Sequence, residues 1–104
     1  MASAWEVSAG QIDATTARTF APFMVAVPDV DYPYAARARR MTGHGVFDIW
    51  FDLKTGLATQ VKILRSTGNP LLNEAAIKGL SRWRAKPGKL SHMQVPVSFA
   101  LKSS

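Results

Sequence analysis

The sequence predicts an α+β fold: a three-stranded antiparallel sheet with two helices on one face, in the order helix, strand, strand, helix, strand. Two stretches of alternating apolar and polar residues flank a short Lys-Thr-Gly turn, which is typical of a hairpin. A third alternating stretch closes the chain, and two further stretches combine helix-start signals with helical apolar spacing. Two helices can cover one face of such a sheet, which gives a two-layer domain.

Length and composition restrict the class of protein. With 104 residues and 47% hydrophobic content, the chain predicts one folded domain, which we place at residues 30–104 after an irregular or β-prone extension, residues 1–29. Cysteine is absent, so disulfides and thiolate metal sites are excluded. No apolar run is long enough to span a bilayer, and no signal peptide is evident. A net charge of +6 favours anionic partners.

The extension has two parts. Its first part, "SAGQIDATTART", is small and polar and predicts a loop, whereas "FMVAV" at residues 23–27 is β-prone. We consider three hypotheses for "FMVAV": it pairs in cis with a sheet edge, including the edge that a partner would use; it exchanges with a second chain; or it lies on the surface as an extended linker.

The first helix is predicted to begin at Tyr32-Pro33, because proline suits the first helical position. Asp31 is the predicted N-cap, and Gly43 is the predicted left-handed residue at the end.

The first two strands are predicted at residues 45–53 and 57–65, joined by a turn in which Gly56 takes positive φ. Phe47, Ile49 and Phe51 point to one face of the first strand, together with Leu53. Trp50 lies on the opposite face. Trp50 and Trp5 are candidate exposed aromatic contacts for a partner; the alternative, which we favour, is that the N-terminal extension covers the aromatic on the open face.

The second helix is predicted from Pro70, with Asn69 as N-cap, to about residue 84. Its apolar stripe follows helical spacing and consists of Leu72, Ala76, Leu80 and Trp83.

The last strand is predicted at residues 94–102. Because Pro96 cannot donate to a ladder, the pattern predicts an edge strand. Alternate residues of a strand bond to the same side, so Ser98 and Ala100 would offer their backbone groups to an incoming strand. Side chains of the intervening residues hold the strand onto the core: Val95, Val97 and Phe99.

Several short motifs occur together in a fixed order: "DYP..A" at 31–36, "GVF" at 45–47, "TG" at 55–56, "STG" at 66–68, "LN..A" at 72–76, "RWR..PGK" at 82–89 and "VPVSFAL" at 95–101. This order resembles the C-terminal domain family of TonB, over residues 30–102. The resemblance implies a non-catalytic periplasmic domain that takes part in energy transduction. The family's proteins are anchored in the inner membrane by a segment that these residues do not include.

The resemblance also implies a partner. Domains of this family bind the TonB box, an extended peptide of outer-membrane transporters, by adding it as a strand beside the last strand. The corresponding positions in this chain are Gln94, Val95, Pro96, Val97, Ser98, Phe99, Ala100, Leu101, Pro28, Asp29, Val30 and Asp31. Peptidoglycan and a strand-exchanged homodimer are further partners that we consider.

Other functions are less well supported by the sequence. A TolA-like interaction domain would share the fold. Nucleic acid is an alternative partner suggested by "RWRAKPGK", but the predicted place of Trp83 on the apolar stripe disfavours it.

The two histidines, His44 and His92, have no metal-ligand spacing, so we predict no metal site and no cofactor. Asp48 and Asp52 are too far apart along a strand for a paired-carboxylate hydrolase, so we predict no enzyme.

Overall fold

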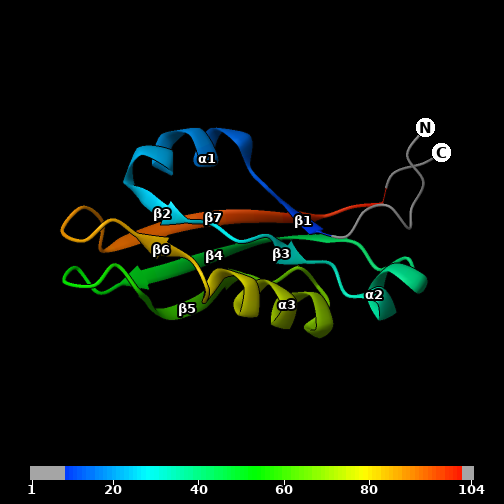
Figure 1. Ribbon diagram of the computed structural model, residues 1–104. Helices are drawn as coiled ribbons and strands as arrows, with labels where there is room; N and C mark the ends of the chain where they lie inside the picture. Colours follow the sequence, from blue (N-terminus) through cyan, green and yellow to red (C-terminus); the bar gives the residue numbers. More distant parts are fainter. Residues whose placement is uncertain (1–8, 102–104) are drawn as a thin grey trace.

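A computed structural model describes residues 9–101 of the chain. In chain order the elements are β1 (Ala9–Ile12), α1 (Ala14–Phe20), the 3-10 helix η2 (Ala21–Phe23), β2 (Met24–Ala26), β3 (Val30–Asp31), α2 (Tyr34–Ala38), β4 (Gly43–Phe51), β5 (Ala58–Arg65), α3 (Pro70–Leu80), β6 (Arg84–Ala85) and β7 (His92–Phe99) (Figure 1). Within residues 9–101, no helix combines the length and apolar character needed to cross a bilayer.

The main sheet has five strands in the order β3-β1-β7-β4-β5, and β2 and β6 form a separate two-stranded sheet. The α+β prediction is therefore confirmed, but the strand count of three was wrong. The predicted hairpin and closing strand are β4, β5 and β7, and all their pairings are antiparallel. The two additional strands, β1 and β3, are too short to show an alternating pattern in the sequence.

The core lies on one face of this sheet. Phe47, Ile49 and Phe51 of β4 are buried there, as predicted, and β7 adds the alternate residues Met93 to Phe99 opposite them. Leu53 lies beyond the end of β4 and is 49% exposed. Helix α3 covers the face with the predicted stripe, because Leu72, Ala76 and Leu80 are fully buried.

Helix α3 begins as predicted and ends earlier. The side chain of Asn69 accepts a hydrogen bond from the Leu71 amide, and Pro70 takes the first turn. The "STG" and "LN" motifs form one polar cluster, since the Asn73 Oδ1 accepts from the Thr67 amide at 2.9 Å and from its hydroxyl at 2.7 Å. Trp83 lies beyond the last helical residue but is still buried.

Helix α2 is short, lies at one end of the sheet (Figure 1) and contributes Ala36 to the core. Its N-cap is Pro33, without a side-chain cap, so Asp31 does not cap it. The left-handed residue after it is Arg40 (φ 56°) rather than Gly43. Gly43 instead begins β4, where a Cβ would lie 2.3 Å from the Thr67 carbonyl oxygen. Close backbone approach, and not helix termination, requires that glycine.

The N-terminal extension is folded from residue 9 onward; Trp5 lies outside the described residues. Met24–Ala26, within "FMVAV", pair in cis with β6, so that segment does not occupy the β7 edge. The predictions of β7 as an edge strand and of residues 8–19 as a loop were wrong: β7 lies between β4 and β1, and β1 belongs to that stretch. Helix α1 then runs along the β7 side of the sheet (Figure 1).

Candidate functional site

The two segments predicted to contact a peptide lie on either side of β1. Val30 and Asp31 of β3 pair with Gly10 and Ala9. On the other side of β1, Val97 and Ser98 of β7 pair with Ile12 and Gln11. We call the space that β1 fills between β3 and β7 the strand slot. Residues 28–31 and 94–101, which are far apart in the sequence, therefore form the two walls of one feature.

The β7 wall has the orientation predicted from its alternation. Val95, Val97 and Phe99 are completely buried and hold the strand onto the core. The Pro96 carbonyl accepts a hydrogen bond from the Asp13 amide at 3.3 Å, so the side of β7 that lacks a proline N–H faces β1. The other predicted positions lie as follows: Gln94 and Ala100 are exposed, Pro96 and Ser98 are half-buried within β7, and Leu101 is half-buried beyond its end.

The β3 wall is fixed from behind by α3 and the chain after it. The Trp83 indole N–H donates to the Pro28 carbonyl at 3.0 Å. Val30 packs against α3 so closely that a Cβ on Gly79 would lie 2.9 Å from the Val30 Cα. Asp29 and Asp31 are exposed, so their carboxylates are available to a partner.

Tyr32 connects the two walls. Its ring meets the Phe99 ring of β7 edge-on, with centroids 5.2 Å apart, and its hydroxyl donates to the Met41 carbonyl. Burial raises the pKa of the Tyr32 phenol above its usual value, so the side chain stays neutral and keeps its proton for this bond. The "DYP" motif thus fixes the distance between β3 and β7.

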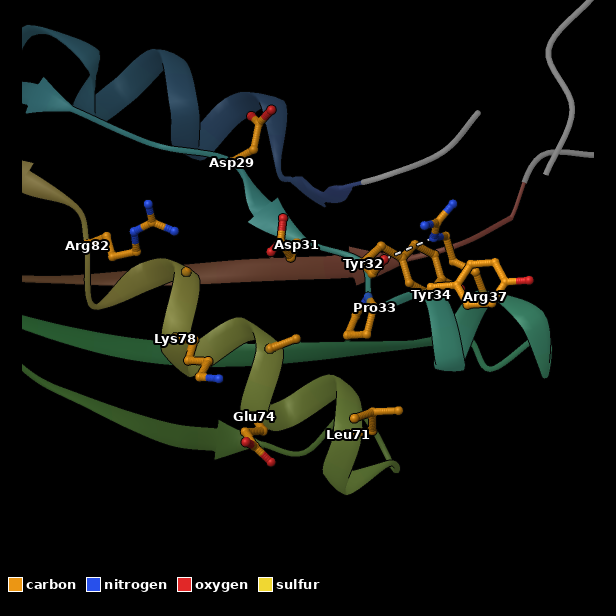
Figure 2. A pocket seen from close by; sticks show the side chains of 12 residues that line it. Asp29, Asp31, Tyr32, Pro33, Tyr34, Arg37, Leu71, Glu74, Lys78 and Arg82 are labelled. Atoms are coloured by element: carbon orange, nitrogen blue, oxygen red, sulfur yellow. Dashed lines mark hydrogen bonds between the residues drawn. The ribbon is translucent and has the colours of Figure 1, made fainter. Parts of the chain in front are cut away.

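A groove of about 750 Å³ borders the β3 wall on its outer side, between β3, α2 and α3. Figure 2 shows Asp29 and Asp31 on one bank and Lys78 and Arg82 on the α3 bank. No ion pair within residues 9–101 joins these acidic and basic side chains. The groove therefore presents charges of both signs to solvent.

The sheet face opposite the core carries a polar cluster. Asp48 is only 6% exposed and lies 2.9 Å from the His92 Nε2. The Trp50 ring stacks at a tilt against His92, with centroids 4.7 Å apart, and the Lys62 ammonium lies 5.5 Å from its centroid. Trp50 is half-buried and contacts these two neighbours within the sheet. His44 contacts the Ser98 hydroxyl through Nδ1 at 2.8 Å.

Asp13 connects the strand slot to α1. Its carboxylate caps the helix by accepting from the Thr16 amide and hydroxyl, both at 3.0 Å. The Thr16 backbone hydrogen bond, followed by its side-chain bond, holds the pKa of Asp13 below the ordinary value of 3.8. A carboxylate with a lowered pKa stabilises the folded form above its unfolded pKa and loses this effect as the pH falls through the folded pKa.

We therefore expect α1 to lose helicity at acid pH before the core unfolds. The measurement is the Cα chemical shifts of α1 by NMR, from neutral pH down through the ordinary carboxyl pKa of 3.8. The Asp13→Asn variant keeps an acceptor at the cap but does not titrate, so its α1 shifts should not follow pH. Equal acid sensitivity in the two proteins would contradict this assignment.

Sequence reasoning missed β1 and the α3 bank of the groove. The one available signal for β1 is Gly10: it is buried, and a Cβ there would lie 3.0 Å from the Phe99 ring. Glycine within an otherwise ordinary segment indicates close approach of another element. In the sequence, Lys78 contributes only to the net charge of +6, and Arg82 belongs only to the stretch "RWRAKPGK".

Comparisons with known proteins identify the family of the chain. The family model described as "Gram-negative bacterial TonB protein C-terminal" matches residues 28–102, which begin at the β3 wall and include all of β7. Protein TonB of Vibrio cholerae serotype O1 is 27% identical over 77 residues, which cover 68% of this chain and 31% of that protein. The chain thus spans about a third of the length of this relative. The NMR structure of the Helicobacter pylori TonB C-terminal domain matches with a TM-score of 0.61 and 26% identity, over 72% of each chain.

Proposed function

The chain belongs to the TonB C-terminal family, and from this premise we propose that it is a non-catalytic, TonB-like periplasmic domain of energy transduction. In this proposal it binds the TonB-box peptide of an outer-membrane transporter by strand addition at β7. The residues proposed to contact the peptide are those of the two walls, residues 94–101 and 28–31.

One observation carries the proposal. Both walls already pair with an extended segment, β1, whose backbone bonds to Val30-Asp31 on one side and to Val97-Ser98 on the other. In strand addition the main-chain ladder supplies the affinity, which should be modest, and the pockets for alternate side chains supply the specificity for one peptide sequence. The strand slot therefore has the form that peptide recognition by strand addition requires.

The proposed setting follows from the family. We place the domain in the periplasm, as the outward-reaching part of a protein that is anchored in the inner membrane. The chain's positive charge would then face anionic cell-wall polymer or peptide segments. Peptidoglycan and a strand-exchanged homodimer stay predicted partners, and a TolA-like interaction domain stays the alternative function.

Trp83 counts against the nucleic-acid alternative. Base stacking needs an accessible aromatic face, whereas Trp83 is 5% exposed and its N–H is bonded to Pro28. The cations beside it are exposed: Arg82 lies in the turn after α3, and Arg84 begins β6.

Titration of the ¹⁵N-labelled protein with a synthetic TonB-box peptide tests the proposal. We expect amide shifts concentrated at Val30-Asp31, at Val97-Ser98 and along β1, and little dependence of affinity on salt. A scrambled peptide of the same composition is the control. Shifts confined to α3, or none at millimolar peptide, would contradict strand addition, and affinity falling steeply with salt would favour an electrostatic ligand instead.

A further inference from the structure

The strand that fills the slot belongs to the chain itself. We propose that β1 is an intramolecular competitor for the peptide site, so that an incoming strand binds only when β1 leaves. This inference rests on the proposed function, because it concerns regulation of the same site. According to this inference, residues 30–104 form the binding domain, and β1 in the preceding residues occupies the binding site when no peptide is bound.

The register of β1 shows what the slot accepts. Ile12 points to the core face and packs against the buried cluster, Gln11 points to the open face and is exposed, and Gly10 is buried again. Beside Gly10 the slot is narrow, because an added Cβ would lie 3.0 Å from the Phe99 ring and 3.2 Å from the Val97 Cγ1. A competing strand therefore needs glycine or another small residue two positions before its core-facing aliphatic residue.

The competitor is held weakly enough to leave. Neither α1, η2 nor β2 contributes a buried side chain, and Gly10 is the one fully buried residue of β1. A cavity of about 580 Å³ is lined by α1 and β2 on one side and by Met93 and Trp83 on the other, and this part of the chain contacts the core through the partly buried Ile12, Phe20 and Met24. Segments with few buried contacts open locally at low free energy.

Release of β1 need not unfold the domain. The core residues of β4, β7 and α3 pack against each other without it. The extension also stays attached downstream, because Met24 and Ala26 of β2 pair with β6. Displacement of β1 would therefore move the start of the extension away from the sheet while β2 stays paired with β6.

A disulfide that holds β1 against β7 and can be opened by reduction, which we call the lock, tests the proposal in the full chain. Gln11 and Ser98 are directly opposed, and such a pair lies within the Cα separation that a disulfide can span. The chain contains no other cysteine, so a Gln11→Cys/Ser98→Cys variant can form one intramolecular bridge. We expect the oxidised form to bind the TonB-box peptide at least about tenfold more weakly than the same protein after reduction, because a ligand binds only the competent fraction.

The opposite effect is expected from a variant that expels β1. Gly10→Val places side-chain atoms against Phe99 and Val97, and should tighten peptide binding by about tenfold or more through the same population argument. Gln11→Val is the matched control: it puts the same side chain on the exposed face of the same strand, away from Phe99, and should not tighten peptide binding. If Gly10→Val fails to fold, the comparison of oxidised with reduced lock still decides the question.

A second probe separates this inference from the proposed function. A synthetic peptide with the sequence of residues 7–14 should bind Gly10→Val and should be excluded by the oxidised lock. If this peptide behaves in that way while TonB-box peptides bind no variant, then β1 does compete for the slot and the TonB box is not the partner. Equal affinity of either peptide for the oxidised and reduced lock would overturn the competition.

Discussion

Replacing Trp83 by alanine is expected to lower the free energy of unfolding by about 3–5 kcal/mol, the usual range for a buried aromatic. Trp83 is 5% exposed, lies beside Leu80 and Ala85 in the core, and holds the β3 wall through its bond to Pro28. Urea denaturation followed by far-UV circular dichroism measures the loss. Trp50→Ala removes the same atoms from a half-buried site and should lose no more than about 2 kcal/mol.

Trp83→Phe separates the hydrogen bond from the packing. Phenylalanine retains most of the apolar contact but leaves the Pro28 carbonyl without its donor, which should cost about 1–3 kcal/mol. The backbone of residues 28–31 should also become more mobile, and faster amide exchange at Val30 would report this. Amide exchange unchanged at Val30 would mean that Trp83 stabilises the core without positioning the wall.

The second large effect is expected at Gly56, in the turn between β4 and β5. Its φ is +78°, and an added Cβ would lie 1.9 Å from the Ala85 carbonyl oxygen. Alanine there has to adopt a left-handed backbone, at about 1–2 kcal/mol, and must also force the turn away from β6. We therefore expect Gly56→Ala to lose at least about 3 kcal/mol of unfolding free energy in urea. The Ala85 amide, which donates to the Gly56 carbonyl at 2.8 Å, should lose its exchange protection.

Gly88 provides a matched control for Gly56. It has the same φ of +78°, but nothing lies within 4 Å of a Cβ built on it. Gly88→Ala should therefore show the conformational part alone, about 1–2 kcal/mol. If the two alanine variants were equally destabilised, contact with Ala85 would not be the reason for glycine at Gly56.

The sequence predicted those elements that are specified by neighbouring residues, through strand alternation or through residues typical of a helix start. The alternation around Phe47 and Ile49 predicts β4 because burial on one face requires it, and Asn69-Pro70 predicts the start of α3 because both residues satisfy a helix terminus. Pro96 correctly indicated that one side of β7 has a missing backbone N–H, which is the side that faces β1. It could not indicate that another part of the chain pairs there.

Long-range contacts decided what the sequence did not predict. In Ala9–Ile12 there is only one large apolar residue, so the segment has no alternation, and its strand conformation comes from pairing with β3 and β7. Gly43 resembled a helix cap, but its role is set by the Thr67 carbonyl, which is distant in sequence. The β7 wall was predicted from Pro96 and the strand alternation as well as from the family resemblance, and residues 28–31 from the resemblance alone. Their juxtaposition comes from long-range contacts, which include the pairing of β1 and the packing of Tyr32 on Phe99.

The place of β1 in the sheet also limits how far molecules can polymerise. With β1 seated, Val97-Ser98 are paired, and the two-residue β3 at the end of the sheet abuts α3 at Gly79. Within residues 9–101, β5 is then the one long strand with an unpaired side, and Lys62, Arg65 and an irregularity in its pairing discourage association there. A sheet with one open edge can add a second molecule and stop, whereas a sheet opened at β7 as well could grow into a fibre. Seating β1 whenever no ligand is present would therefore keep a peptide-accepting edge soluble at high concentration.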